Sequence, residues 1–433
     1  MSRAVIVSMG CSKNLVDSER LAAMMAGRGI DVVFDGEPQA GDDVVVNTCG
    51  FIGDAKEESI DMLLKAIALK QQGKVGRVFA MGCLSERYRG ELAEEMPELD
   101  GLYCKFDWSG IADVLAAGET PARPWERRLS TAPHYTYIKI SEGCNRFCAF
   151  CAIPLITGRH HSRAIGEIAD EVRALVAGGV KEFNIIAQDL SAYGSDLGMA
   201  GDRSPLAELI DTLARIEGVE MLRLHYAYPA GFPYDILPVM ASHPNVCKYL
   251  DIALQHIDDA VLANMRRHIT AAETEELLAR IRREVPGIHI RTTLMVGFPG
   301  EDEDAFERLM DFVRRQRFER MGAFAYCEED DTYAARNLED NIPEDVKQKR
   351  LDRLMALQQD IAFEHAAAKA GSEIKVIVDR EEPDCYVGRS EFDSPEVDCN
   401  VLISKDTRLK PGDICTVHVD SSCGFDLTGH VVG

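Results

Sequence analysis

The chain has 433 residues, of which 46% are hydrophobic and 28% are charged. These proportions are typical of soluble globular proteins and exclude a disordered chain, and the length predicts about two to four domains. No run approaches the roughly 18 apolar residues of a membrane helix, and Ala4–Val7 is too short for a signal peptide, so we expect a cytoplasmic protein without a membrane partner. A net charge of −24 disfavours nucleic-acid partners, unless a local basic patch overrides it, and favours basic proteins.

Short β-rich runs alternate with helical patterns over residues 1–120. The expected strands are Ala4–Ser8, Asp31–Phe34, Val44–Asn47 and Arg77–Ala80, and the expected helices are Ser18–Arg28, Lys56–Gln71 and Glu86–Met96. Strand and helix alternation predicts a parallel sheet with helices on both faces, hence an α/β domain. The following stretch, residues 121–133, is rich in Pro and Arg and is expected to be a linker.

A second and longer series of strands and helices occupies residues 134–370. Its expected strands are Tyr135–Ile140, Glu182–Ala187, Met221–His225, Tyr249–Ala253, His289–Val296 and Gly322–Ala325. The expected helices are Ile165–Ala177, Pro205–Ile216, Ala271–Glu284, Asp304–Arg317 and a long charged helix from Pro343 to about Ala370. Six strands rather than eight favour an incomplete (β/α) barrel.

The last segment, residues 371–433, is β-rich and is punctuated by Pro, Gly and Asp turns. Runs at Ile374–Val378, Asn400–Ile403 and Ile414–Val419 predict a small β-barrel.

Three cysteines, Cys144, Cys148 and Cys151, fall within eight residues directly after the first predicted barrel strand. Soft thiolates so close together suit an iron–sulfur cluster or zinc. A four-iron cube held by three thiolates keeps one iron open to a small molecule, and the carboxyl end of a barrel strand is where such folds place their chemistry. Zinc would need a fourth ligand, for which His160 and His161 are candidates, although the spacing is not that of a zinc finger. We favour the iron–sulfur cluster and keep zinc or chance clustering as alternatives.

Three further cysteines, Cys11, Cys49 and Cys83, each closely follow a predicted strand of the first domain. Because ligands collect at the carboxyl ends of parallel strands, the three loops could form a second three-thiolate cluster. Three ordinary buried cysteines are the alternative. The other seven of the thirteen cysteines show no ligand spacing, and we expect them to be inert.

Polar or turn-forming residues end the other barrel strands. They are Gln188-Asp189, His225-Tyr226, Gln255-His256 and the run Gly297 to Glu301. Each of these groups is weak evidence for a site by itself, because loops are polar in any case. Together they predict one pocket.

The six ordered cysteines, the part-barrel and the terminal β-barrel resemble the methylthiotransferase family of radical S-adenosylmethionine enzymes. The resemblance covers essentially the whole chain. It implies a flavodoxin-like N-terminal domain over residues 1–120, a radical S-adenosylmethionine domain as a partial (β/α)6 barrel over 134–370, and a TRAM domain over 371–433.

The resemblance also implies two 4Fe–4S clusters. Cys144, Cys148 and Cys151 would hold the cluster that binds S-adenosylmethionine, and Cys11, Cys49 and Cys83 would hold an auxiliary cluster that carries the transferred sulfur. In place of the family's usual Gly-Gly-Glu the chain has Ala187-Gln188-Asp189. We expect Gln188, Gly297 and Gly300 to contact S-adenosylmethionine, and we assign no catalytic residue beyond the cluster ligands.

The mechanism that the resemblance implies uses one S-adenosylmethionine to methylate the stored sulfur and another to generate a 5′-deoxyadenosyl radical. The radical would take hydrogen from an unactivated C–H bond, which no acid or base could deprotonate. An electron donor such as flavodoxin or ferredoxin and a sulfur source would be partners.

The family divides between enzymes for a transfer RNA adenosine and enzymes for the β-carbon of an aspartate in small-subunit ribosomal protein S-twelve. Residues 371–433 contain six Lys and Arg against thirteen Asp and Glu, whereas a domain that grips RNA should carry a basic face. The acidic stretch Gly388–Asp398 and the motif from Ser8 to Glu19 resemble the ribosomal-protein type, although an acidic run can also be a solvated loop. We therefore predict the ribosomal protein, free or in the subunit, as substrate. A transfer RNA substrate is the alternative. A third interpretation is an iron–sulfur electron carrier, but a carrier would gain nothing from an open iron.

Overall fold

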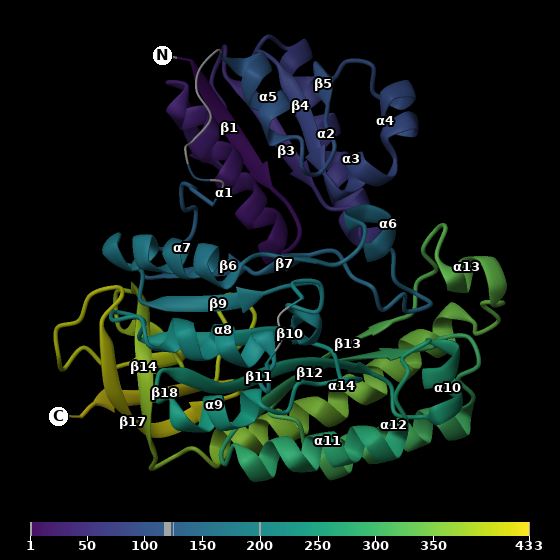
Figure 1. Ribbon diagram of the computed structural model, residues 1–433, viewed down its shortest axis with the longest axis vertical. Helices are drawn as coiled ribbons and strands as arrows, with labels where there is room; N and C mark the ends of the chain where they lie inside the picture. Colours follow the sequence, from purple (N-terminus) through teal and green to yellow (C-terminus); the bar gives the residue numbers. More distant parts are fainter. Residues whose placement is uncertain (1, 117–122, 124, 199–200, 433) are drawn as a thin grey trace.

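The computed structural model describes residues 2–116, 123, 125–198 and 201–432 (Figure 1). A five-stranded parallel sheet lies at the top of Figure 1, the part-barrel lies below it, and the terminal barrel packs against one side of the part-barrel. Within the described ranges, no helix has both the length and the apolar character needed to cross a membrane.

The first sheet has the strand order β2-β1-β3-β4-β5, which is the flavodoxin-like order. Its strands are β1 (Arg3–Ser8), β2 (Asp31–Phe34), β3 (Asp43–Thr48), β4 (Val78–Gly82) and β5 (Gly101–Leu102). Its helices are α1 (Ser12–Gly27), α2 (Gly53–Gln71), α3 (Cys83–Arg87), α4 (Arg89–Glu95) and α5 (Trp108–Leu115). Strands β1, β3 and β4 bury both faces, one in each of two apolar clusters, which is why their sequences are continuous apolar runs.

Two elements of this domain differ from the sequence prediction. Helix α1 begins at Ser12, six residues before the predicted start at Ser18, because polar residues that look like a loop are buried in its first turns. The predicted helix Glu86–Met96 is broken at Tyr88 into α3 and α4. Helix α5 and strand β5 were not predicted.

The second sheet is parallel and open, with the order β13-β12-β11-β10-β9-β6. Its strands are β6 (Tyr135–Lys139), β9 (Glu182–Ile186), β10 (Met221–Ala227), β11 (Val246–Gln255), β12 (His289–Val296) and β13 (Arg320–Ala325). Its helices are α6 (Ile153–Thr157), α7 (Ile165–Ala177), α8 (Pro205–Ala214), α9 (Ile236–Ser242), α10 (Asp259–Asn264), α11 (Ala271–Glu284), α12 (Glu303–Gln316), α13 (Tyr333–Asn337) and α14 (Glu344–Ala367), with a short hairpin of β7 (Ser141–Glu142) and β8 (His161–Ser162). Among the described residues β6 and β13 do not pair, so the incomplete barrel predicted from six strands is confirmed.

The terminal domain is a closed barrel in the order β14-β15-β16-β18-β17. Its strands are β14 (Glu373–Glu381), β15 (Tyr386–Ser390), β16 (Val401–Ile403), β17 (Ile414–Cys423) and β18 (Asp426–Val431). The predicted β-barrel is therefore confirmed, although β15 and β18 were not predicted. It docks on the part-barrel through a buried pair, in which both Nη atoms of Arg389 contact the Glu182 carboxylate at 2.9 and 2.7 Å.

The predicted linker, residues 121–133, falls partly on residues outside the described ranges, namely 121, 122 and 124. Its described part is packed against both domains. Arg127 is buried and forms ion pairs with Glu19 of α1 at 2.8 Å and with Glu171 of α7 at 3.0 Å. This segment therefore fixes the first sheet relative to the barrel.

Candidate active site

The triplet Cys144, Cys148 and Cys151 lies on the loop between β7 and α6. The loop is held by the backbone N–H of Cys144, which donates to Gly158 O at 3.2 Å, and by that of Ala149, which donates to Met265 O at 2.9 Å. Gly143 has a φ of +74°, and a Cβ there would lie 2.1 Å from Arg159 O. Only glycine fits this position, so the local backbone presents the three thiols from one tight loop.

Cationic and polar groups surround these thiols. Nη1 of Arg267 lies 3.3 Å from Sγ of Cys148, and the N–H of Arg146 donates to Sγ of Cys144 at 3.4 Å. The guanidinium groups of Arg146 and Arg267 also lie over the ring of Tyr228, 4.2 and 4.1 Å from its centre. Positive charge beside sulfur stabilises the thiolate form that binds metals.

Burial raises the pKa of Cys144 to about 11, and it raises the pKa of Cys151 further, with added contributions from the neighbouring cysteines. These two thiols would therefore stay protonated at neutral pH unless a metal displaced their protons. In the part of the chain that the structure describes, no three Cys, His, Asp or Glu side chains converge on one metal ion. Cys148 is buried, and Cys144 and Cys151 are half-buried. Three soft ligands around an iron–sulfur cluster, in which each thiolate binds its own iron, fit this arrangement better than a single zinc does.

Cys11, Cys49 and Cys83 follow the carboxyl ends of β1, β3 and β4, which are neighbours in the sheet. A Cβ on Gly10 would lie 2.7 Å from Sγ of Cys49, so the loop after β1 passes directly over that thiol. Burial raises the pKa of Cys83 to about 11, and negative charge on Cys11 and Cys49 adds to this effect. The structure thus brings together three cysteines that are far apart in sequence.

Buried polar residues of α1 support this second triplet. Asn14 accepts from Sγ of Cys83 at 3.4 Å and from Nζ of Lys105 at 2.8 Å. Burial alone would raise the pKa of Cys11, but Lys13 and Lys105 bring it below its ordinary value. The second triplet therefore also has cations that favour thiolates.

The two triplets are adjacent. Cys83 packs in one apolar cluster with Ala152 and Ile156, and Ala152 directly follows Cys151. Helices α3 and α6, which carry these residues, are in contact.

We predicted that three residues contact S-adenosylmethionine. Gln188 lies in the loop after β9, and Gly297 and Gly300 lie in the loop after β12. Nε2 of Gln188 donates to Glu142 at 2.7 Å, while its buried Oε1 has no partner among the described residues. A Cβ on Gly297 would lie 2.4 Å from Lys347, and one on Gly300 would lie 2.4 Å from Asn264. Protein packing alone therefore requires both glycines, and their contact with the cofactor stays a prediction.

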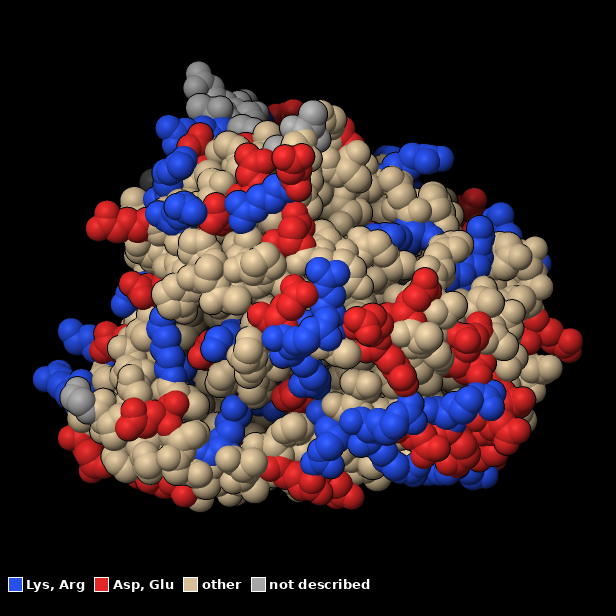
Figure 2. Space-filling view, turned by 60° about the horizontal axis from the view of Figure 1, so that its bottom comes forward, with Lys and Arg blue, Asp and Glu red and all other residues tan. Residues whose placement is uncertain are grey.

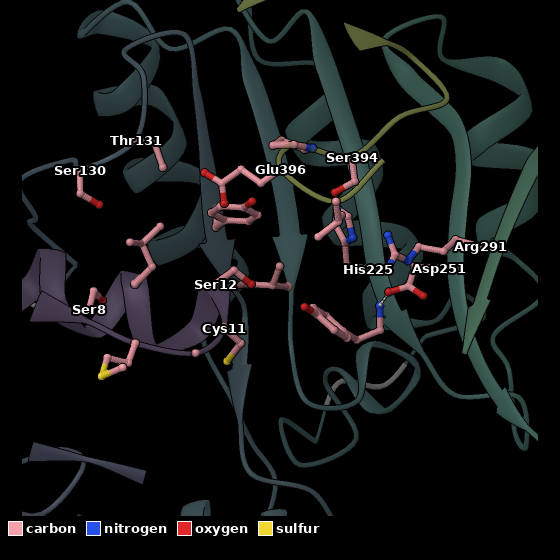
Figure 3. Close-up of a pocket in the computed structure, with 18 of the residues that line it drawn as sticks. Ser8, Cys11, Ser12, Ser130, Thr131, His225, Asp251, Arg291, Ser394 and Glu396 are labelled. Carbon is pink, nitrogen blue, oxygen red and sulfur yellow. Dashed lines mark hydrogen bonds between the residues drawn. The ribbon is translucent and has the colours of Figure 1, made fainter. Parts of the chain in front are cut away.

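A cavity of about 540 Å³ lies between the first domain, the part-barrel and the loop after β15 (Figure 3). Cys11 and Ser12 line it from α1, His225, Asp251 and Arg291 line it from the barrel strands, and Ser394 and Glu396 line it from the terminal domain, as Figure 3 shows. Apolar walls are provided by Leu15, Tyr137, Ile186 and Ala253. The cavity opens next to the second triplet through Cys11.

The predicted single pocket of strand-end residues is only partly present. His225 and Tyr226 line the cavity, but Gln188, His256 and Glu301 do not. His256 instead pairs with Glu301 at 3.2 Å, with both side chains fully buried, and Arg350 binds Glu301 at 2.7 Å. These residues tie the barrel to α14, so their polarity reflects structure.

The acidic stretch Gly388–Asp398 is not a solvated loop. Asp398 pairs with Arg291 at 3.0 Å, Asp393 pairs with Arg320, and Glu396 accepts from the hydroxyl of Tyr135 at 2.9 Å. On the face in Figure 2, Lys and Arg side chains lie beside Asp and Glu side chains in several places. Several carboxylates of this domain therefore neutralise barrel arginines, and the charge count supports a basic partner less than the sequence implied.

Sequence reasoning missed Arg146, Tyr228 and Arg267 beside the first triplet and Lys105 beside the second. Arg146 lies between two of the cysteines, so its position gave a signal. Arg267 and Lys105 gave none, because only the fold brings them to thiols 119 and 22 residues away.

Family models match all three parts of the chain. The Radical SAM superfamily matches residues 138–313, the TRAM domain matches residues 370–432, and Uncharacterized protein family UPF0004 matches residues 3–103. The match to the Radical SAM superfamily includes Cys144, Cys148 and Cys151. The fold and this site define a radical S-adenosylmethionine enzyme, which uses an iron–sulfur cluster and S-adenosylmethionine.

Close relatives narrow the class. The "Ribosomal protein uS12 methylthiotransferase RimO" of Parabacteroides distasonis is 55% identical over 99% of this chain and 98% of that protein. The protein of the same name from Christiangramia forsetii is 45% identical over 99% of this chain and 94% of that one. This chain belongs to the RimO family of methylthiotransferases, and the predicted family is confirmed.

Solved structures share the fold at low identity. The radical S-adenosylmethionine methyltransferase TsrM from Kitasatospora setae, with cobalamin and a [4Fe-4S] cluster bound, is 14% identical with a TM-score of 0.57, over 89% of this chain and 81% of that one.

Proposed function

We propose that this enzyme adds a methylthio group to the β-carbon of an aspartate in ribosomal protein uS12. We also propose that it does so with two 4Fe–4S clusters, one on Cys144, Cys148 and Cys151 and one on Cys11, Cys49 and Cys83. The observation that carries the proposal is the contact of Cys83 with Ala152, the residue after Cys151. Two triplets of free thiols that lie side by side, one of which reaches a cavity through Cys11, suit a reaction that joins a carbon radical to a stored sulfur.

When bound, the clusters and S-adenosylmethionine would supply the radical and the methylthio group. The chain's own residues hold and enclose them. Arg267 and the N–H of Arg146 stabilise thiolates of the first triplet, and Lys105 does so at the second. Asn14 accepts from the thiol of Cys83 and so positions that side chain. Leu15, Ile186 and Ala253 on the cavity wall would help to keep water away from the substrate.

The choice of uS12 is supported by the relatives. They match nearly the full chain, and their names give uS12 as the substrate. The acidic composition of residues 371–433 adds less support, since Asp393, Glu396 and Asp398 are used within the protein. Because the proposed substrate is ribosomal, we propose that the enzyme acts in the cytoplasm. An electron donor such as flavodoxin or ferredoxin and a sulfur source would serve it there.

Mass spectrometry of uS12 from cells with and without this enzyme tests the substrate. We expect a methylthio increment on one aspartate only when the enzyme is present. An unmodified aspartate together with a lost methylthio group on transfer RNA adenosine would reverse the choice.

Anaerobic assay of reduced, reconstituted protein with S-adenosylmethionine tests the chemistry. We expect 5′-deoxyadenosine. Its absence, with both clusters present and reducible, would indicate an electron carrier instead.

A further inference from the structure

We propose that Lys13 binds the side-chain carboxylate of the substrate aspartate and so selects aspartate over its uncharged amide. This inference rests on the proposed function and names the residue that recognises the reacting side chain. The inference rests on one juxtaposition. The buried ammonium of Lys13 forms no ion pair with a carboxylate in the described residues, and it lies close to the cavity beside Cys11.

Lys13 lies in the first turn of α1 and is 8% exposed. Its Nζ lies over the ring of Tyr226, 3.1 Å from the ring centre. Within the described ranges, no carboxylate forms an ion pair with it. The other buried lysines nearby differ, because Lys105 and Lys139 share the carboxylate of Asp17.

A buried charge without an ion pair is costly, since water no longer solvates it and no carboxylate contacts it directly. The face of Tyr226 offsets part of this cost through its quadrupole but does not neutralise the ammonium. A Lys ammonium has three donors, and the aromatic contact leaves it able to donate to an anion. The site is therefore built for an incoming negative group.

The cavity is the place from which that group would come. Tyr226 lines it, as do Gly10, Cys11 and Ser12 around Lys13. The other cation on its wall, Arg291, is already paired with Asp398 at 3.0 Å. Burial and neighbouring arginines hold the pKa of His225 well below its ordinary value, so His225 is neutral and does not compete for an anion.

The carboxylates on the cavity wall are engaged or disfavoured as partners. Asp251 accepts from the N–H of Tyr226 at 3.2 Å, and burial raises its pKa even though Arg291 and Lys13 act in the opposite direction. Asp35 accepts from the N–H of Ser8 at 3.0 Å, and Glu396 accepts from Tyr135. Lys13 does not itself line the cavity, but it lies against Tyr226, which does, and within the described residues it forms no ion pair. A substrate carboxylate that enters beside Tyr226 would therefore find this cation unpaired.

The geometry suits the reaction. The β-carbon of an aspartate is bonded to its carboxylate carbon, so a carboxylate held at Lys13 keeps the reacting carbon within two bonds of the anchored group. Lys13 is two residues from Cys11, a thiol of the second triplet. Anchoring there would place the carbon beside the sulfur that it must capture, and an asparagine side chain would lose the charged interaction.

The competing explanation is that Lys13 only stabilises the Cys11 thiolate. The two explanations predict different readouts. A residue for the substrate changes peptide discrimination and leaves iron content unchanged, whereas a residue for the thiolate changes iron content.

The experiment compares two synthetic peptides from the target loop of uS12, one with the aspartate and one with asparagine in its place. Binding to the reconstituted holoenzyme is measured anaerobically by fluorescence anisotropy, for wild type, Lys13→Met, Lys13→Arg and the control Lys65→Met. Lys65 is exposed on α2 and forms no ion pair in the described structure. Iron content and the unfolding midpoint are measured for each protein.

Wild type, Lys13→Arg and Lys65→Met should bind the aspartate peptide about tenfold or more tightly than the asparagine peptide, because a charged hydrogen bond to a buried partner is lost with asparagine. Lys13→Met should bind both peptides alike and, because Lys105 still stabilises the Cys11 thiolate, keep most of the iron of wild type. Unchanged discrimination in Lys13→Met, or a loss of iron as its main effect, would overturn the assignment. If the wild-type enzyme neither binds nor modifies the peptide or whole uS12, the proposed function itself fails.

Discussion

The two cysteine triplets are built in opposite ways. Cys144, Cys148 and Cys151 come from one loop, fixed by a glycine with positive φ and by two backbone hydrogen bonds. Cys11, Cys49 and Cys83 come from three strand ends and meet only because β1, β3 and β4 are neighbours in the sheet. The first arrangement depends on local backbone geometry, and the second depends on the whole domain being folded. The two triplets should therefore respond differently to substitution.

The largest effect is expected for Cys148→Ala. Removing one ligand of the local triplet should abolish 5′-deoxyadenosine formation and remove roughly half of the bound iron. Anaerobic reconstitution followed by chromatography of the nucleoside product measures this. Cys423→Ala, at an exposed cysteine of the terminal barrel, is the matched control and should behave as wild type. Normal cleavage in Cys148→Ala would contradict the assignment.

Cys49→Ala should separate the two functions. It should also lose about half of the iron, yet still cleave S-adenosylmethionine, while methylthiolation of uS12 stops. Iron analysis, nucleoside product and mass spectrometry of uS12 are measured on one preparation. Full iron retention would show that Cys49 is not a ligand.

Asp17→Asn tests the dependence of the second triplet on the fold. Asp17 is fully buried between Lys105 and Lys139, so its substitution leaves two buried ammonium groups poorly compensated and should cost about 3–5 kcal/mol of unfolding free energy. Urea unfolding measures this, with Asp61→Asn, an exposed residue of α2, as the control.

The stabilisation that is lost in Asp17→Asn should also depend on pH. Burial opposes ionisation of Asp17, but Lys105 and Lys139 keep its pKa below the ordinary 3.8. Its stabilising contribution is therefore present above that value and is lost as pH falls through the lower pKa of the folded state. The gap between wild type and Asp17→Asn should narrow below pH 3.8. A gap that widened on acidification would contradict this account.

Gly143→Ala should have the smallest effect on stability, about 1–3 kcal/mol, since the added Cβ meets Arg159 O at 2.1 Å in a backbone conformation that alanine rarely adopts. The strain is confined to the loop, so iron should be lost from the first triplet only. Gly166→Ala in α7 is the control, because open space surrounds that position. Loss of iron from both triplets would show that the loop also supports the second.

Much of this molecule could be predicted from the sequence, for reasons that the two triplets illustrate. The bounds of α7, α11 and β12 were predicted because apolar periodicity decides where buried elements lie. The start of α1 was missed, because Asn14 and Asp17 look like loop residues until Lys105 and the thiols are placed beside them. The acidic composition of Gly388–Asp398 likewise gave no sign of its ion pairs with Arg291 and Arg320, which join residues about 70 to 110 positions apart. Pairings of that kind depend on the tertiary fold and leave no local pattern.

Iron and sulfide analysis of the two triple variants tests the central claim most directly. Wild type should hold about eight irons and eight sulfides per chain, as two four-iron clusters require, and replacement of either triplet by alanine should leave about four of each. A wild-type protein with only about four irons, zinc in place of iron at either triplet, or a triple variant that keeps the full amount would contradict two separate clusters.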